Sequence, residues 1–288
     1  METPMTDISA EKAAIDRLRR CQRNWDTSKV IPEEHLQHWI YLAQNSPSKQ
    51  DFSYYDTYVI TDPVILDALL TMSWGCTYLV IPNGKVEGDK IGIKIQRKGQ
   101  KDHLDLDESK WITGRVRNPQ VRASAYFIFT EKKVEHQLHV LPDGTRESID
   151  HDNRRSNTLI SAGIAMGVIG SSAARLGYAT GYNTCHGTGD EKKLVRNLLG
   201  MRDHEYMVGG IGIGYPQPNR HWYESDETNI QFTVPGGYKE VDISQGEFEL
   251  NGQTLVPDFT KLDFTTLSAK QTETGFDNIP KLISVKRF

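Results

Sequence analysis

Cysteine is scarce in this sequence of 288 residues, and its three copies, Cys21, Cys76 and Cys185, lie far apart. An odd number of scattered cysteines forms neither a disulfide framework nor the paired spacing of a zinc site. We therefore expect a reducing, cytoplasmic compartment and no metal site. The stretch from Met1 to Glu11 carries acids and lacks an apolar core, so we do not expect it to act as a signal peptide.

An excess of positive charge is also missing, because the formal net charge is −4 at pH 7. A protein that neutralises many phosphates usually carries a basic excess, so we expect no nucleic-acid partner. The charge-free stretch Ser156–Ala174 is long enough to test for a membrane span, but it contains several polar residues. We favour a buried helix and expect no membrane partner. Its small residues Gly163, Gly167 and Gly170 permit tight packing inside the core or across a dimer.

Motifs for hydrolysis and for nucleotide binding are absent as well. The nine histidines form no HExxH pattern, and the carboxylates form no distinctive pair. The glycine-rich stretch Tyr178–Gly189 matches neither GxGxxG nor GxxxxGK[ST]. Cys185 and His186 are adjacent, and adjacent side chains rarely face each other as a nucleophile and its base. The sequence therefore disfavours a hydrolase.

The apolar pattern predicts helices first, followed by strands mixed with helices. Helices are predicted over Ala10–Arg23, from Pro32 to the loop at Asn45–Ser48, after Asp62, over Asp150–Leu176, and from Asp190 to Leu199. Strands are predicted over Tyr54–Thr61, Thr77–Ile81, Ile91–Ile95, Ala123–Thr130, Tyr178–Tyr182 and Met207–Ile213. This order favours a layered α+β domain over a βαβ repeat.

Two segments stand outside this pattern. Arg97–Asn118 is polar and weakly patterned, so we expect a surface segment without regular structure. Beyond Pro216 there are two strand-like pieces and an Asn251-Gly252 hairpin turn, and we expect this tail to wrap over the domain or a partner. Since no linker composition separates the tail, we predict one domain over residues 1–288 with a C-terminal extension at about 217–288.

Three segments are candidates for ligand binding. Arg19 and Arg23 share a face of the first predicted helix and could hold a phosphate, although a solvated basic face is the simpler interpretation. The loop Ser46–Gln50 offers hydroxyls, backbone N–H groups and an ammonium, or it is a plain connection. The stretch Tyr178–Gly189 runs from a strand into a glycine-rich loop, which could direct backbone N–H groups at a ligand.

In this order the segments resemble the flavin-dependent nitroreductase family. The matching stretches are LRRCQRNWD with KVIPEEHL, SPSKQDFSYYDTYVI, SAGIAMGVIGSSAARLGYATGY, LVRNLLGM and GGIGIGYP. The resemblance extends from about Ala13 to Pro216, apart from about Trp74–Gln120, and so implies an insertion at about 74–120. It implies a nitroreductase-like layered α+β sandwich, with a central mixed or antiparallel sheet flanked by helices. It also implies an intertwined homodimer with FMN at the interface.

The resemblance implies roles for residues at the phosphate end of FMN. Arg19 and Cys21 would hold the phosphate and the ribityl chain, with Arg20 beside them. Arg23 would lie near the pyrimidine ring of the flavin, and Arg220 would add a phosphate contact.

Two loops would border the flavin ring by the same resemblance. The first loop would come from the other subunit and would contribute Pro47, Ser48, Lys49 and Gln50. The second loop would present a backbone N–H to flavin N5, and it contains Asn183, Thr184, Cys185 and His186.

The implied reaction needs no catalytic acid. Flavin N5 accepts hydride from NADH or NADPH, and the electrons pass to a nitroaromatic, a quinone or a similar small-molecule acceptor. Departures from the family pattern leave the acceptor open; among them, Cys21 replaces a usual Ser and Asp51 a usual Asn. A specialised flavoenzyme of the same fold is one alternative. A non-catalytic flavin-binding or interaction protein is the other, and the divergent second motif and the long tail motivate it.

Overall fold

The structure is a computed structural model, and it describes residues 8–48, 51, 53–97, 112–132, 138–140, 142–144, 146–148, 154–186, 190–202, 205–220 and 227–257. The chain divides into two units. The first unit comprises Met1–Trp74 and Asn118–Trp222, and the second comprises Gly75–Arg117 and Tyr223–Phe288. We predicted the insertion and the C-terminal extension as separate additions to one domain. In the structure, most of both segments belongs to the second unit.

A four-stranded antiparallel sheet forms the centre of the first unit. Its strand order is β1 (Tyr55–Ile60), β5 (Ala125–Glu131), β9 (Met207–Gly214) and β8 (Ala179–Asn183). Side chains of the buried strand β5 alternate between the two faces of the sheet. Phe127 and Phe129 belong to the core on one face, and Tyr126 and Ile128 to the core on the other.

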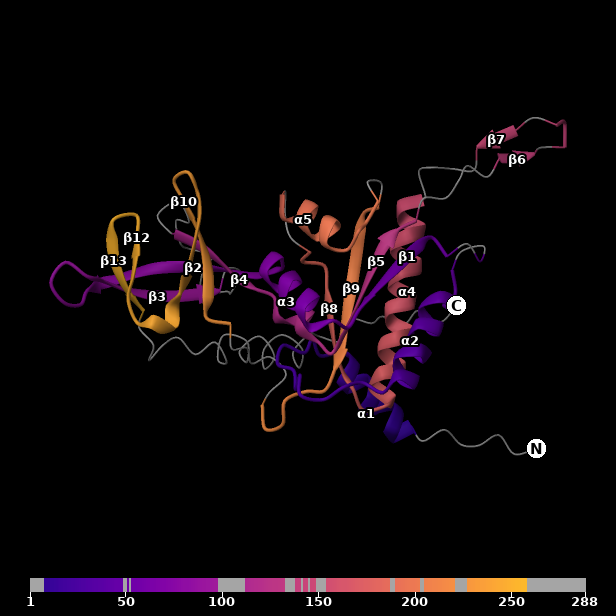
Figure 1. Ribbon diagram of the computed structural model, residues 1–288, viewed down its shortest axis with the longest axis horizontal. Coiled ribbons are helices and arrows are strands. Elements are labelled where there is room, and N and C mark those ends of the chain that lie inside the picture. The colour runs from indigo at the N-terminus through magenta and orange to yellow at the C-terminus, as the bar shows by residue number, and fades with distance from the viewer. Residues whose placement is uncertain are drawn as a thin grey trace, which may run out of the picture. The chain divides into compact units, whose positions relative to one another are not determined.

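Helices cover both faces of this sheet (Figure 1). The core around Phe127 includes side chains of α2 (Glu33–Asn45) and α4 (Arg154–Arg175). The core around Ile128 includes side chains of α3 (Pro63–Met72) and α5 (Asp190–Leu198). The structure thus confirms the predicted α+β class. The remaining elements of this unit are α1 (Ile8–Leu18), the 3-10 turn η4 (Pro119–Arg122) and the hairpin β6 (Leu138–Val140) with β7 (Arg146–Ser148).

The local signals in the sequence explain where these helices begin and end. Pro32 precedes α2, and Trp39 in its apolar stripe is completely buried. The Asp62 carboxylate accepts a hydrogen bond from the backbone N–H of Val64 and so caps α3. Gly200, with φ of +62°, follows the end of α5 in the left-handed conformation that glycine tolerates.

The first helix is shorter than predicted. It ends at Leu18, and the backbone N–H of Gln22 donates to Thr180 O at 2.9 Å. The side chain of Gln22 donates to Asn24 O at 2.6 Å. These bonds replace the helical ones, so the expectation that Arg19 and Arg23 share a helix face is wrong.

A seven-stranded sheet forms the second unit. Its strand order is β11 (Gly237–Asp242), β10 (Asn229–Val234), β4 (Ile112–Arg117), β2 (Trp74–Lys85), β3 (Ile91–Arg97), β13 (Gln253–Pro257) and β12 (Phe248–Leu250), with the turn η5 (Ile243–Gln245) after β11. The rings of Phe232 on β10 and Phe248 on β12 stack 5.5 Å apart. Lys239 Nζ on β11 also donates to Glu249 O on β12. The two edge strands therefore approach each other, and the sheet curls around its own hydrophobic core.

Two predictions for these segments are wrong. Residues 112–117 of the segment expected to lack regular structure form β4, which pairs with β10. The tail contains the strands β10–β13 rather than two strand-like pieces. Gly114 conceals the strand pattern of β4, because it holds an inward position where an apolar residue is expected. The Asn251-Gly252 turn is confirmed, with φ values of +51° and +75° between β12 and β13.

Candidate functional site

The residues that follow α1 lie along the edge of the central sheet. Strand β8 is an edge strand, and the backbone of Gln22 bonds to it at Thr180. Cys21 Sγ lies 4.0 Å from Tyr182 O, one residue before the end of β8. The tertiary structure thereby brings the arginine segment next to the loop that begins at Asn183.

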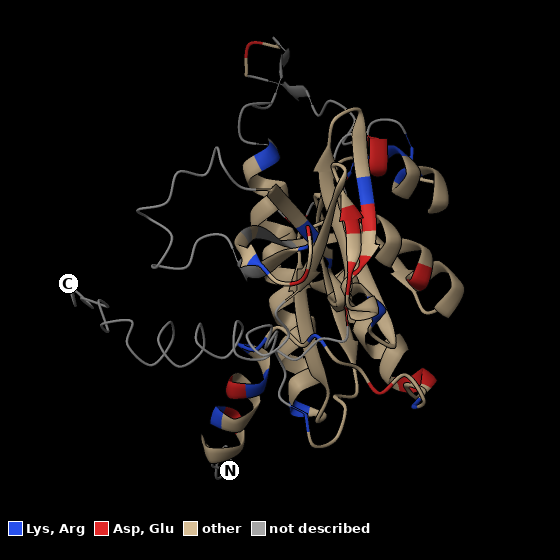
Figure 2. Ribbon diagram, turned by 90° about the vertical axis from the view of Figure 1, so that its left-hand side faces the viewer, with Lys and Arg blue, Asp and Glu red and all other residues tan. Residues whose placement is uncertain are grey.

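The arginines of this segment form a cationic group near the end of α1. Figure 2 shows both signs of charge along that helix. Arg19 is half-exposed and forms an ion pair of 3.1 Å with Asp16. No described residue bonds to the guanidinium of Arg20, which is exposed. Arg23 Nη1 donates to Cys21 O at 3.1 Å. Clustered guanidinium groups with donors facing solvent fit a phosphate.

A buried group of polar side chains lies where β8 ends. The Oη of Tyr126 is 2.7 Å from Nε2 of His186 and 3.0 Å from Nδ2 of Asn183. Asn183 Oδ1 accepts from the backbone N–H of Cys185 at 2.7 Å and from Asn118 Nδ2 at 2.9 Å. Asn183 and His186 are buried, whereas Thr184 between them is exposed.

One backbone group fixes the direction of these hydrogen bonds. Since the N–H of Cys185 can only donate, the amide oxygen of Asn183 faces it, and the amide nitrogen faces Tyr126. Tyr126 Oη accepts from that nitrogen and donates its own proton to His186 Nε2. His186 is then neutral, with its proton on Nδ1. Burial, aided by the charge of Lys192, lowers the pKa of His186 to about 4, and burial raises the pKa of Tyr126.

The sequence analysis missed Tyr126 and Asn118. The available signal was a single polar tip in the otherwise apolar run ASAYFIFT, since a buried tyrosine hydroxyl needs a partner. Its partner could not be read from the sequence, because His186 lies far along the chain. No cluster of three or more His, Cys, Asp or Glu side chains occurs in the part of the chain that the structure describes.

The other candidate residues lie elsewhere. Pro47 is exposed, and Ser48 Oγ accepts from the backbone N–H of Ser53 at 2.9 Å. Lys49 and Gln50 fall outside the described residues. Arg220 Nη1 donates to Gln217 Oε1 at 3.3 Å.

The family model described as "Nitroreductase family" matches residues 17–215, which is more than half of the chain. The chain belongs to the nitroreductase family. This membership confirms the resemblance inferred from the sequence motifs. None of the curated proteins matches the chain.

Solved structures of nitroreductases resemble this family member at low identity. A nitroreductase with bound FMN from Bacteroides fragilis is 16% identical and has a TM-score of 0.45, over 75% of this chain and 92% of that one. The NfrA1 nitroreductase from B. subtilis is 15% identical with a TM-score of 0.47, over 74% of this chain and 70% of that one. A proposed NAD(P)H:FMN oxidoreductase from Staphylococcus epidermidis is 14% identical with a TM-score of 0.47, over 77% and 93%.

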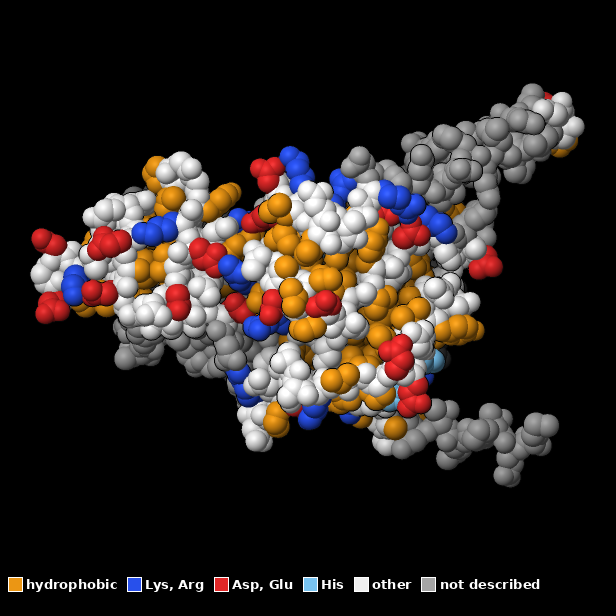
Figure 3. Space-filling model, in the orientation of Figure 1, with side chains coloured by type: hydrophobic (Ala, Val, Ile, Leu, Met, Phe, Trp, Pro, Cys, Tyr) orange, Lys and Arg blue, Asp and Glu red, His pale blue; other side chains and the backbone are white. Residues whose placement is uncertain are grey.

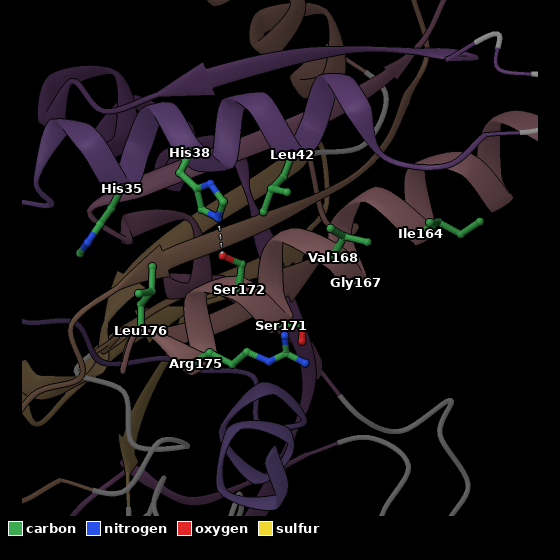
Figure 4. A pocket seen from close by; sticks show the side chains of 10 residues that line it. All are labelled: His35, His38, Leu42, Ile164, Gly167, Val168, Ser171, Ser172, Arg175 and Leu176. Atoms are coloured by element: carbon green, nitrogen blue, oxygen red, sulfur yellow. Dashed lines mark hydrogen bonds between the residues drawn. The ribbon is translucent and has the colours of Figure 1, made fainter. Parts of the chain in front are cut away.

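A hollow of about 780 Å³ lies between α2 and α4 of this family member (Figure 4). His35, His38 and Leu42 line it from α2, and His38 Nε2 lies 3.1 Å from Ser172 Oγ on α4. A Cβ added at Gly167, on its wall, would have no neighbouring side chain or other element of the chain within 4 Å. The same holds for Gly163. In contrast, Gly170 packs inward against Tyr182.

The exposed side of α4 is apolar. Its exposed large hydrophobic residues are Leu159, Ile160 and Ile164, and the exposed Leu176 follows directly after the helix. Figure 3 shows hydrophobic side chains gathered where α2 and α4 lie. Residues Arg155–Arg175 are long and apolar enough to cross a membrane, but Ala165 and Ile169 are completely buried in the core. The apolar character of α4 therefore comes partly from the core and partly from this exposed side.

Proposed function

We propose that the protein is an FMN-dependent oxidoreductase that passes hydride from NADH or NADPH to a nitroaromatic, a quinone or a similar acceptor in the cytoplasm. Membership of the nitroreductase family over residues 17–215 supports an oxidoreductase. The observation that carries the flavin assignment is the contact between two candidate segments. Cys21 and Gln22 lie against β8, so the arginine segment and the loop Asn183–His186 meet at one edge of the sheet.

The residues at this edge suit the parts of FMN. Arg19 and Arg20 present guanidinium donors to solvent, as phosphate binding requires. Arg23 adds a cation, which would stabilise negative charge on the reduced pyrimidine ring. FMN, when bound, supplies the hydride acceptor at N5, so the chain itself needs no catalytic acid or nucleophile. Its task is to bind the phosphate, orient the ring and limit access of water.

We further propose that two copies of the chain form a homodimer through α2 and α4. The exposed apolar side of α4 and the open glycine positions Gly163 and Gly167 support a close partner. Among the described residues, no hydrogen bond or ion pair joins Ser46, Pro47 or Ser48 to either segment of the candidate site. This loop would therefore complete a site in the second subunit.

The absorption spectrum of the purified protein tests the flavin assignment. We expect the visible bands of oxidised flavin, and we expect chromatography of the heat-released cofactor to identify FMN rather than FAD. A colourless protein that shows no FMN binding in a fluorescence titration would contradict the proposal.

Anaerobic addition of NADH or NADPH tests the reaction. Bleaching of the bound flavin is expected with at least one of the two. Flavin that binds but does not bleach would favour the non-catalytic alternative. Product analysis with nitroaromatics and quinones would separate a reductase from a specialised flavoenzyme.

A further inference from the structure

The buried group of Tyr126, Asn183 and His186 lies outside the residues proposed to bind the phosphate and outside the two helices proposed to form the dimer. Tyr126, which bonds to both Asn183 and His186, is completely buried, and His186 is only 3% exposed. Water cannot reach a buried polar group to replace a lost partner, so breaking either hydrogen bond leaves a buried group unpaired. The two hydrogen bonds of Tyr126 therefore stabilise each other. The loop is therefore tied to β5 at its first residue, Asn183, and at its last described residue, His186.

The neighbouring strand makes room for this arrangement. Gly210 on β9 is the residue that pairs with Asn183 on β8. A Cβ at position 210 would lie 2.7 Å from Tyr126 Oη and 2.7 Å from Phe127 O. Only glycine at this position lets the hydroxyl of Tyr126 reach Asn183 and His186. The bonding of the loop thus depends on residues from β5, β8 and β9.

We propose that Tyr126 and His186 are positioning residues that hold the loop Asn183–His186 in one conformation before the cofactor binds. Asn183 already takes the backbone N–H of Cys185. The loop amides left to meet the flavin ring are therefore those of Thr184 and His186. This inference rests on the proposed function, because it assigns the ordered loop to flavin.

Preorganisation gives this arrangement its effect on binding. A loop that is ordered only when a ligand arrives loses conformational freedom at that step, and the affinity falls accordingly. If the Tyr126 hydroxyl is lost, the loop should gain alternative conformations while the fold around it stays intact. We expect Tyr126→Phe, which removes the buried hydroxyl and both of its hydrogen bonds, to weaken FMN binding about tenfold or more.

Amide hydrogen exchange on the flavin-free protein tests the ordering of the loop directly. In Tyr126→Phe, exchange at the Cys185 N–H, which is bonded to Asn183 Oδ1, should accelerate about tenfold or more. The matched control is Tyr58→Phe, which removes a tyrosine hydroxyl bonded to Glu205 rather than to the loop. In the control, the exchange rate of the Cys185 amide should stay unchanged. Equal exchange in Tyr126→Phe and the wild type would overturn the proposal.

Substitution of His186 provides a second and independent comparison. His186→Gln keeps an oxygen that can accept the Tyr126 proton, whereas His186→Leu has no acceptor. We expect the glutamine variant to retain more of the wild-type affinity for FMN and of the visible circular dichroism of the bound flavin. Equal losses in both variants, or none in either, would contradict the positioning role.

The two proposals fail in different ways. A wild-type protein that does not bind FMN contradicts the proposed function and the flavin role of the loop, and the exchange rates still decide whether Tyr126 orders it. If FMN binds and exchange accelerates in Tyr126→Phe, but the affinity and spectrum of the flavin stay unchanged, the proposed function stands and the positioning role is overturned.

Discussion

At the scale of single residues, the same side chain type has different roles in different surroundings. Arg19 and Arg122 both have about half of their side chain exposed, at 48% and 47%, and each pairs with an aspartate. Arg19 alone belongs to a group of arginines, with Arg20 and Arg23, and the intervening Cys21 and Gln22 contact β8. Exposed ion pairs contribute little to stability, so what distinguishes Arg19 is the phosphate it would bind.

Arg19→Ala should therefore weaken FMN binding without destabilising the fold. A charge-assisted phosphate contact contributes about 1.5–3 kcal/mol, so the dissociation constant should rise about tenfold or more. Fluorescence titration of the flavin measures the change, and the loss should be greatest at low salt. Arg122→Ala is the control and should bind FMN as the wild type does. An unchanged dissociation constant for Arg19→Ala would assign this residue to a solvated face.

A second residue-scale feature is the buried carboxylate of Glu205. It accepts from Tyr58 Oη at 2.5 Å and from the backbone N–H of Arg202 at 2.9 Å, and Arg202 Nε donates to it at 2.7 Å. Burial favours the neutral acid, but these hydrogen bonds outweigh it, so the pKa of Glu205 is lowered. Burial, followed by the neighbouring Glu205 carboxylate, raises the pKa of the Tyr58 hydroxyl to about 12.

This lowered pKa predicts how stability changes in acid. The folded state holds the charged form, so the contribution of Glu205 is complete above its unfolded pKa of about 4.3 and is lost as the pH falls through the folded value. Glu205→Gln should lower the free energy of unfolding by about 1–3 kcal/mol at pH 7 and reduce its decline in acid. Urea unfolding between pH 7 and pH 3 measures both. The control is Glu247→Gln, which removes an exposed ion pair with Lys90. It should lower the free energy of unfolding by less than about 1 kcal/mol. Equal acid sensitivity of the wild type and Glu205→Gln would contradict this account.

At the scale of elements, one helix serves two surfaces. The inward residues of α4 fill the core, whereas Gly163 and Gly167 leave open space on its other side. Gly170 belongs to the inward side, because a Cβ there would lie 2.6 Å from Leu18 Cδ1. Substitutions on the two sides of α4 should therefore have different consequences.

Gly167→Leu should disrupt the dimer but not the fold of the subunit. The added side chain meets nothing within its own chain at the Cβ, but it would overpack a close partner by about 1–3 kcal/mol or more. Sedimentation at micromolar concentration should show dissociation, together with loss of flavin. Gly170→Ala, in contrast, should lower the unfolding midpoint. A Gly167→Leu variant that is monomeric and keeps FMN would place the whole site within one chain.

In the second unit, β4 depends on a glycine to fit beside β10. A Cβ at Gly114 would lie 2.4 Å from Ile230 Cγ2 and 2.9 Å from Phe232 Cε1. Gly114→Ala should therefore destabilise this unit by about 1–3 kcal/mol, which denaturant unfolding would measure. Gly92→Ala on β3 is the matched control, since its closest neighbour would lie at an ordinary 3.4 Å. Equal stability of the two variants would show that β4 and β10 are less closely packed than the structure indicates.

At the scale of the whole molecule, cofactor binding and assembly should be coupled. If each flavin site contains residues of both subunits, dilution that separates the subunits must also release FMN. We expect sedimentation and flavin fluorescence to report one common transition as the protein is diluted. Added FMN should shift that transition to lower protein concentration. A flavin-loaded wild-type monomer would contradict the coupling.

Features that depend on near neighbours in the chain can be predicted from the sequence alone. The apolar spacing around Trp39 specified α2, Asp62 and Pro63 specified the start of α3, and Asn251-Gly252 specified a hairpin turn. The ordered motifs were sufficient to identify the nitroreductase family. Each of these signals is contained within a short stretch of chain, so it survives without knowledge of the fold.

Features that depend on partners distant in sequence are visible only in the folded protein. Strand β4 is stabilised by its pairing with β10, and α1 ends early because Gln22 bonds to β8. The insertion and the tail form one sheet, and Tyr126 forms a hydrogen bond with His186, which is remote in sequence. These four features have the same physical cause. A ladder bond or a buried side-chain bond is formed between segments remote in sequence, and neither segment alone encodes which partner it will meet.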